Sequence, residues 1–249
     1  MISRRAFVAS AVSAGGLMLS GCDRLHANEQ FRGLLGSAEG LTMRAQRLIL
    51  DRSDLAREYG EADLSPIFRS NWTRVPDTSE YARLMAGNFA DWRLTVDGLV
   101  RRPLSLSLDA IRQMPLRTQI TRHDCVEGWS AIGKWHGVPL GTVLNAAGLS
   151  DGARFIVFHC LDRFGAAPYY ESIDLVDAFH PQTILAWGMN GAMLPVPNGA
   201  PLRLRVERQL GYKHAKFIGR IEAVRSLAGI QGGKGGFWED RGYEWYAGI

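Results

Sequence analysis

Short strand-like segments with a helical segment among them limit this chain to a mixed architecture. Residues 92–98 alternate apolar and polar side chains and end at a glycine, which predicts a half-buried strand. The apolar run 155–158 predicts a buried strand, and residues 139–148 have helical spacing between a proline and a glycine. These elements do not alternate regularly as in a doubly wound sheet. We therefore expect an α+β fold with mixed sheets and short helices.

The composition is that of a globular protein. Of 249 residues, 46% are hydrophobic and 22% are charged, which supports a packed core and excludes a disordered chain. Three cysteines are too few for a disulfide scaffold. The net charge of +4 is small for this length, so we expect no nucleic-acid partner.

The first 22 residues have the pattern of an export signal. Arg4 and Arg5 precede an apolar run that is shorter than the roughly 20 residues needed to cross a bilayer. The arginine pair resembles a twin-arginine signal, and residues 19–22 resemble a lipobox ending at Cys22. We expect the protein on the periplasmic side of the inner membrane, anchored through a lipid on Cys22. A plain signal peptide that happens to contain this cysteine is the alternative.

The rest of the chain divides into a leader and a main domain. Leu41, Ala45 and Leu48 have the spacing of one helix face, so residues 23–70 are interpreted as a leader with a helix. Residues 71–249 are expected to form the functional domain. No period of 20 to 50 residues recurs, which argues against a repeat architecture.

Cys125 is the first candidate for chemistry. Its neighbours Arg122 and His123 are cations or potential cations, which favour the reactive thiolate. An inert buried cysteine and a disulfide to Cys160 are the structural alternatives. The sequence 128–132 superficially resembles the nucleophile elbow of serine hydrolases, but its second glycine is missing.

A zinc or copper site is a second hypothesis. His123 and Cys125 lie close in sequence, and His159 adjoins Cys160, so folding could bring together four nitrogen and sulfur ligands. The chain has no Cys-x-x-Cys pair and no His-x-x-x-His helix, which weakens this hypothesis.

The segment 201–225 is strongly basic. It contains seven basic residues and two acidic ones. Gly211 starts a turn within this segment that could gather several hydrogen-bond donors around one anion. A solvated strand face is the alternative, as is an anion-binding lipoprotein without turnover. The glycine-rich sequence 232–236 lacks the spacing of a phosphate-binding loop and is expected to be flexible. The basic residues are Arg203, Arg205, Arg208, Lys213, Lys216, Arg220 and Arg225.

Two motifs together resemble the sulfite-oxidase fold family of molybdopterin oxidoreductases. Arg-x-x-Cys-Val-Glu-x-Trp-Ser occupies residues 122–130, and Asn-Gly-Ala-Pro-x-Arg-Leu occupies residues 198–204, followed by Gly-Tyr-Lys-His-Ala-Lys at 211–216. The resemblance is greatest to the compact bacterial exported branch, which includes methionine-sulfoxide reductases. It runs from about residue 65 to the end of the chain and implies a sulfite-oxidase-type fold.

The resemblance implies a role for each matching position. Cys125 would be the thiolate ligand of molybdenum, and the pterin dithiolene would supply the other sulfurs. Cys160 would contact the cofactor, which argues against a disulfide to Cys125. Glu127 and Trp129 would shape the substrate entrance. The remaining cofactor-binding positions would be Asn71, Arg74, Asn198, Arg203, His214, Ala215 and Lys216.

The resemblance also implies the activity. Oxygen-atom transfer at molybdenum would act on a small molecule of the sulfoxide, sulfite or N-oxide class, with electrons exchanged with a separate cytochrome or membrane partner. The chain ends at Ile249 without room for an immunoglobulin-like dimerisation domain, and it contains no Cys-x-x-Cys-His heme motif. We therefore expect a monomer.

Overall fold

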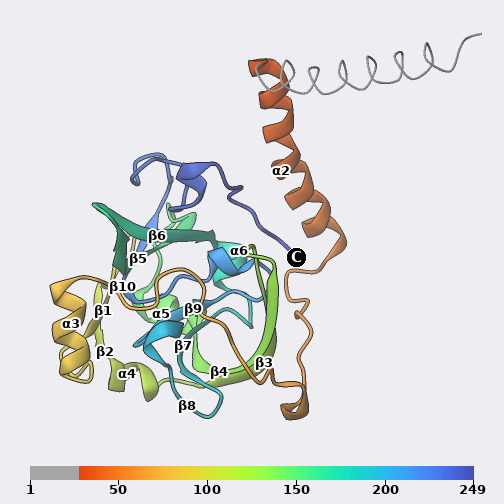
Figure 1. Ribbon diagram of the computed structural model, residues 1–249. Helices are drawn as coiled ribbons and strands as arrows, with labels where there is room; N and C mark the ends of the chain where they lie inside the picture. Colours follow the sequence, from red (N-terminus) through yellow and green to blue (C-terminus); the bar gives the residue numbers. More distant parts are fainter. Residues whose placement is uncertain (1–27) are drawn as a thin grey trace, which may run out of the picture. The chain divides into compact units, whose positions relative to one another are not determined.

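A computed structural model describes residues 28–249 in two units (Figure 1). The first unit, up to Ile49, contains helix α2 (Glu29–Ile49), which confirms the predicted helix in the leader. The second unit is Leu50–Ile249, so the division falls earlier than the boundary expected at residue 70. The export signal and Cys22 lie outside the described residues. Within residues 28–249 no helix has the length and apolarity to span a bilayer.

Two five-stranded sheets form the second unit (Figure 1). Only the pair β1–β10 is parallel in the first sheet; the other neighbours are antiparallel. The order of the first sheet is β2 (Leu104–Ser107), β1 (Arg93–Gly98), β10 (Ile218–Val224), β5 (Phe155–Phe164) and β6 (Ala167–Asp174).

The second sheet is antiparallel and contains the candidate site. A long hairpin of β3 and β4 leads to β7, which pairs with β4 and also with β8 and β9. Arg203 of β9 lies opposite Ala186 of β7, and Arg205 lies opposite Ile184. The strands are β3 (Arg117–Cys125), β4 (Trp129–Pro139), β7 (Ile184–Met189), β8 (Ala192–Met193) and β9 (Arg203–Arg205).

The helices of the second unit are short and have clear sequence boundaries. Pro139 precedes α5, and Gly148 ends it with a positive φ of 69°, as the sequence predicted. Ser107 and Thr78 each accept a backbone N–H at the start of a helix. The helices are α3 (Ser79–Ala86), α4 (Leu108–Arg112), α5 (Leu140–Ala147), α6 (Leu175–Ala178) and the 3-10 turns η1 (Glu61–Asp63), η2 (Val196–Asn198), η3 (Gly211–Lys213) and η4 (Glu239–Arg241).

One large hydrophobic core joins both sheets. It combines side chains of β1, β5 and β10 with those of β4, β7 and β9 and with the buried face of α5. The strands predicted at 92–98 and 155–158 contribute to it. The expected α+β class with mixed sheets and short helices is therefore confirmed. Representative core residues are Leu94, Val96, Val138, Leu140, Val143, Leu144, Phe158, Leu185, Leu204 and Ile221.

Residues 50–70 belong with the second unit because they bond to the β3–β4 hairpin. The Tyr59 N–H donates to the carbonyl of Ile120 at 2.9 Å, and the Ser65 N–H donates to the carbonyl of Ile132 at 3.1 Å. Residues 50–70 are polar and have no strong hydrophobic periodicity. The sequence therefore contains no signal that the second unit begins before residue 70.

The C-terminal segment is fixed by a buried charge cluster. The Lys213 ammonium donates to the carboxylates of Glu171 on β6 and Glu239 on η4, and all three side chains are buried. The Lys213 ammonium is therefore already neutralised by protein carboxylates and is not free to bind the anion expected in the basic turn. The glycine-rich loop is also packed rather than flexible, because its backbone N–H groups at Gly232 and Lys234 donate to Asp240.

Replacing Lys213 with alanine should strongly destabilise the second unit. Two buried carboxylates would lose their cation, which lowers the free energy of unfolding by about 3–5 kcal/mol. Urea unfolding measures the change. Lys234→Ala in the neighbouring exposed loop is the control and should alter stability by less than about 0.5 kcal/mol. Equal unfolding midpoints for the two variants would contradict the role of the cluster.

Candidate functional site

Cys125 lies at the end of β3, just below a tight surface turn. The turn connects β3 to β4, and the Gly128 N–H donates to the Cys125 carbonyl at 3.0 Å. Gly128 has a φ of 86°, a conformation that favours glycine. The cysteine is only 8% exposed, whereas Val126 and Glu127 in the turn are exposed. The hairpin thus holds the thiol at the edge of the interior.

The buried face of β3 carries polar side chains instead of apolar ones. Gln119, Thr121, His123 and Cys125 alternate along the strand, and all four are buried. Side chains two residues apart on a strand share a face. The sequence suggested His123 as a potential cation beside Cys125 and as a metal ligand, whereas the alternation of a strand, counted back from Cys125 in steps of two, indicates this whole face.

Both described cysteines outside the signal are free thiols, so the disulfide alternative is excluded. Burial raises the pKa of Cys125; the backbone amide of Glu127 opposes this effect, the Glu127 carboxylate adds to it, and Arg203 opposes it. Cys160 lies on β5 opposite Ile218, and burial together with Asp162 raises its pKa well above the usual value. Lys216 acts electrostatically on Cys160 and is itself influenced by Cys125.

Most cations of the basic segment 201–225 are neutralised by carboxylates. Arg205 forms a bidentate pair with Glu207, in which both side chains are fully buried. The solvated-face alternative is therefore wrong for β9. Further ion pairs join Lys213 to Glu171 and Glu239, Arg208 to Asp177, and Arg220 to Asp97 and Glu222.

Arg203 is buried without such a carboxylate in the described part of the chain. Its side chain is 1% exposed, and no carboxylate of residues 28–249 lies within ion-pair distance of it. Nη1 donates to the carbonyl of Asn198 at 2.9 Å, while Nε and Nη2 have no partner among the described atoms. Burial and the neighbouring Arg205 lower the pKa of Arg203 to about 9. The guanidinium also lies over the Trp135 ring, 5.0 Å from its centroid.

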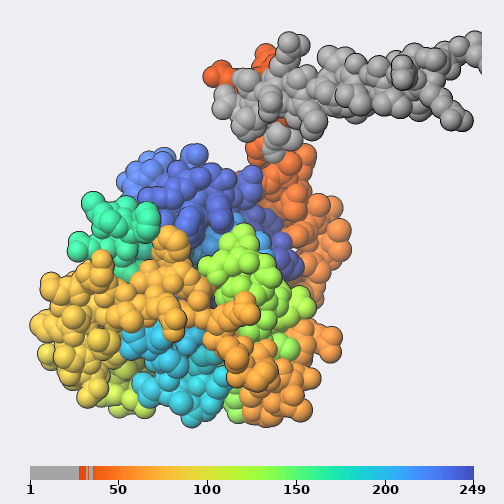
Figure 2. All heavy atoms as spheres, viewed as in Figure 1, coloured from red at the N-terminus to blue at the C-terminus, as the bar shows by residue number. Residues whose placement is uncertain are grey.

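Lys216 is buried too, and its ammonium ties three chain segments together. Nζ donates to the carbonyls of Asn71 at 2.6 Å, Thr73 at 2.5 Å and Pro197 at 3.0 Å. Figure 2 shows the surface of the same region, where the orange and yellow segment around residue 70 adjoins the cyan segment around residue 190. Burial and Arg203 lower the pKa of Lys216 to about 7. Its donors are thus used by backbone oxygens.

His214 and Ala215, two more of the expected cofactor-binding residues, are also buried. His214 Nε2 donates to the carbonyl of Gln209 at 3.0 Å, and Nδ1 has no partner among the described atoms. Burial, Arg205 and Arg203 lower its pKa well below the usual value. The Ala215 carbonyl accepts the Leu204 N–H at 2.8 Å, which fixes the turn to β9.

The remaining predicted positions are only partly gathered at this site. Asn198 is buried at the end of η2, and its Nδ2 has no partner in the described structure. Asn71 joins through its backbone carbonyl, but the Arg74 side chain is exposed. At the entrance, Trp129 Nε1 donates to Glu127 at 2.9 Å.

The residues present fit an anionic ligand rich in hydrogen-bond acceptors. The buried side-chain nitrogens without a partner in residues 28–249 include those of Asn198, Arg203, His123 and His214, besides several tryptophan indoles. Buried donors are almost always satisfied in folded proteins, so a cluster of free ones marks a binding site. Its positive charge matches the phosphate and pterin of the cofactor that the sequence resemblance implies.

The four candidate ligands of a zinc or copper site are not gathered. His159 Nε2 contacts Glu222 at 2.8 Å on the neighbouring strand, and His123 bonds to Arg205. Within residues 28–249 no cluster of three or more histidine, cysteine, aspartate or glutamate residues could hold a metal. The hypothesis of a site built from protein ligands alone thus gains no support.

Arg203→Met and Arg205→Met should differ strongly in their effect on the stability of the cofactor-free protein. Removing Arg203 eliminates a buried cation that has no carboxylate partner, so stability should stay within about 1 kcal/mol of wild type despite the lost hydrogen bond. Removing Arg205 leaves Glu207 buried and unpaired, which should cost about 3–5 kcal/mol. Denaturant unfolding measures both. A strongly destabilised Arg203→Met protein would refute the interpretation of that charge.

The stability of the cofactor-free protein should depend on pH through Lys216. The pKa falls from 10.5 to about 7 on folding, so the unfolded chain binds more protons between these values. Stability therefore rises with pH in this window. Between pH 6 and 9 the wild type should gain roughly 2 kcal/mol relative to Lys216→Met in denaturant unfolding. Parallel pH profiles of the two proteins would show that Lys216 does not titrate there.

A family model and two curated proteins match this chain. The model of the oxidoreductase molybdopterin binding domain matches residues 82–228. The "Putative protein-methionine-sulfoxide reductase subunit YedZ1" of Azospira oryzae is 37% identical over 99% of this chain and 88% of its own length. The protein-methionine-sulfoxide reductase catalytic subunit MsrP of Xanthomonas campestris is 36% identical over 62% of this chain and 51% of its own length.

A solved structure supports the fold. The sulfane dehydrogenase SoxCD from Paracoccus pantotrophus has a TM-score of 0.51 and 22% identity, over 55% of this chain and 39% of that chain. At this identity the likeness concerns architecture only, and it agrees with the sulfite-oxidase-type fold expected from the sequence. The family match extends over more than half of the chain and includes Cys125, Asn198, Arg203 and Lys216. The chain therefore belongs to the molybdopterin-binding oxidoreductase family, and the protein is an oxidoreductase that uses molybdenum–molybdopterin.

Proposed function

We propose that this protein reduces sulfoxides by oxygen-atom transfer at a molybdenum centre ligated by Cys125. The observation that carries the proposal is the buried cation Arg203, which has unused donors beside Asn198 and acts electrostatically on the Cys125 thiol. A buried positive charge without a protein anion is costly, and a bound anionic cofactor would neutralise it. A metal at Cys125 would stabilise the thiolate that burial disfavours.

The substrate class is proposed from the relatives. Both curated relatives are named as subunits of protein-methionine-sulfoxide reductases, and one of them aligns with nearly the whole chain. Sulfoxide reduction consumes two electrons and two protons and yields a sulfide and water. Sulfite and N-oxides are the competing substrate classes, which a substrate panel with artificial electron donors separates.

The residues of the site have distinct proposed roles. Bound molybdenum–molybdopterin would supply the two-electron chemistry and accept the oxygen atom. Arg203 and Asn198 would bind its pterin and His214 and Ala215 its phosphate, with Cys160 in contact from β5. Lys216 would contribute charge and hold Asn71 in place through the backbone. Arg74, which is exposed, would contact the ligand only after a side-chain movement.

The entrance to the site is proposed to lie at the β3–β4 turn. Glu127 and Trp129 are joined by a hydrogen bond of 2.9 Å there, and the exposed Val126 adds an apolar surface next to Cys125. A sulfoxide has a polar S–O group between apolar substituents, so an entrance with both kinds of surface suits it. The turn would orient the substrate and limit the access of water.

We also propose where the protein works and with which partner. The arginine pair at residues 4 and 5 and the lipobox ending at Cys22 support twin-arginine export and anchoring on the periplasmic side of the inner membrane. A separate cytochrome or membrane protein would deliver the electrons, and the enzyme would act as a monomer. Membrane fractionation with labelled fatty acid, compared with Cys22→Ala, tests the anchor.

Metal and pterin analysis is the decisive experiment. Protein purified from cells that make molybdopterin should contain stoichiometric molybdenum and release a fluorescent pterin on oxidation. Stoichiometric zinc or copper instead would favour a site built from protein ligands. A protein without either, and without turnover, would favour an anion-binding lipoprotein.

Cys125→Ser should abolish sulfoxide reduction while the fold is kept. The hydroxyl is a much poorer ligand for a soft metal than a thiolate, and the substitution changes one atom in a buried position. Activity with a reduced dye and a sulfoxide, together with circular dichroism, measures the two outcomes. Cys160→Ser makes the same exchange at a residue proposed to contact the cofactor without ligating the metal, so it should lower the activity without abolishing it. A Cys125→Ser enzyme with the wild-type rate would exclude this ligand.

A further inference from the structure

His123 lies on the buried face of β3, two residues before Cys125, and its ring is fixed by packing. The rings of Trp129 and Phe68 lie 5.4 and 5.6 Å from it, and the ring of His214 stands perpendicular to it at 5.0 Å. The side chain is 1% exposed. The imidazole therefore has one orientation, and each of its nitrogens has a defined environment.

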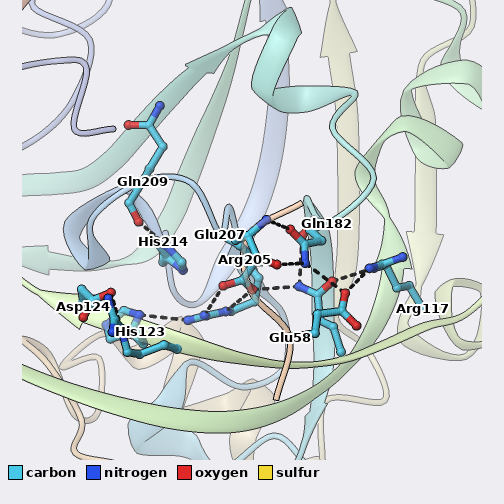
Figure 3. A network of polar contacts seen from close by, with 12 residues as sticks. Glu58, Arg117, His123, Asp124, Gln182, Arg205, Glu207, Gln209 and His214 are labelled. Carbon is cyan, nitrogen blue, oxygen red and sulfur yellow. Dashed lines mark hydrogen bonds and ion pairs between the residues drawn. The ribbon is translucent and has the colours of Figure 1, made fainter. Parts of the chain in front are cut away.

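One ring nitrogen can only accept a hydrogen bond. Arg205 Nη1 lies 2.9 Å from His123 Nδ1 (Figure 3). A guanidinium has donors only, so Nδ1 must carry the lone pair. With the lone pair on Nδ1, the proton of the ring is on Nε2.

Arg205 itself cannot turn away from this contact. Its Nε and Nη2 donate to the two oxygens of Glu207 at 2.9 and 2.6 Å, and Gln119 Nε2 donates to Glu207 at 2.8 Å. The guanidinium also lies over the Trp135 ring at 4.3 Å. Figure 3 shows this network extending through Gln182 to the chain surface. A bidentate, fully buried pair is a rigid support.

The other ring nitrogen, Nε2, carries a hydrogen that no described residue accepts. His123 Nε2 is buried and has no partner among residues 28–249. The ring of His123 stands perpendicular to that of His214, a residue of the proposed cofactor site, at 5.0 Å. Nε2 of His123 borders Gly211, where a Cβ would lie 2.5 Å from it, so only a glycine leaves room beside this nitrogen. An anion bound among these residues is the acceptor that a free N–H in this place would meet.

We infer that Arg205 holds His123 as the tautomer protonated on Nε2, and that this N–H donates a hydrogen bond to the anionic cofactor bound beside Arg203. Arg205 is thus a positioning residue, and His123 is a further binding residue. The second half of the inference rests on the proposed function, whereas the tautomer is a property of the protein alone.

Nitrogen-15 NMR of the cofactor-free full chain tests the tautomer directly. His180 is an internal standard, because its Nε2 lies 2.9 Å from the Asp54 carbonyl and its Nδ1 accepts the Gln182 N–H at 3.2 Å. We expect His123, assigned by its loss in His123→Gln, to show the same Nε2–H pattern as His180. A proton on Nδ1 of His123 would overturn the inference.

The role of Arg205 is tested by removing its ion pair as a unit. Arg205→Met alone would leave Glu207 unpaired, so the double variant Arg205→Met/Glu207→Met replaces both charges with apolar side chains of similar size. We expect the His123 signals to change to a mixture of tautomers while those of His180 stay the same. An unchanged Nε2–H pattern at His123 would show that Arg205 does not fix it.

The donor role is tested by retention of the cofactor. His123→Gln keeps an N–H near the position of Nε2, whereas His123→Phe keeps a ring of similar shape without a donor. We expect molybdenum and pterin to dissociate about tenfold faster from His123→Phe than from wild type, with His123→Gln in between or unchanged. Equal dissociation from all three proteins would overturn the donor role.

The proposed function, the donor role of His123 and its tautomer are refuted by different results. A wild-type protein without molybdopterin would refute the proposed function and the donor role together, and the NMR result would then decide the tautomer alone. A wild-type protein rich in molybdopterin whose His123→Phe variant retains it fully would refute only the donor role.

Discussion

The unneutralised positive charge of Arg203 is the feature on which the functional site depends. Burying a charge is expensive unless an anion accompanies it, and the fold supplies such an anion for Arg205, Lys213 and Arg220. Arg203 has no such carboxylate within residues 28–249, and its Nε and Nη2 keep unused donors beside Asn198. A negatively charged ligand would neutralise this charge, which agrees with membership of a molybdopterin-binding family.

The site is assembled from segments that are far apart in the sequence. The β3–β4 hairpin contributes Cys125, the η2 turn contributes Asn198, and Lys216 draws the backbone at Asn71 and Thr73 against Pro197. The network of Figure 3 contacts the polar face of β3 through the hydrogen bond from Arg205 to His123. Amide and guanidinium groups do not relay protons well, so we interpret this network as a support and not as a path for protons.

The sequence predicts local elements well and the pairing of charges poorly. Pro139 and Gly148 mark α5 because proline and glycine have strong positional preferences at helix ends. No local pattern shows that Lys213 forms ion pairs with Glu171 and Glu239, because these carboxylates come from other elements of the fold. The division between the two units after Ile49 also has no local sequence signal, because it depends on contacts that residues 50–70 make with the distant β3–β4 hairpin. The motif around Cys125 indicated the chemistry, but only the three-dimensional contacts separate the free cation from the paired ones.

The number of hydrogens on Lys216 Nζ determines how many backbone carbonyls this side chain can bind. An ammonium has three N–H groups and can serve the carbonyls of Asn71, Thr73 and Pro197 at once, whereas a neutral amine has only two. With a pKa of about 7, the empty site loses one of these attachments in mildly alkaline solution. A negative ligand bound beside Arg203 would favour the protonated ammonium, and the protonated ammonium would in turn keep these three carbonyls together.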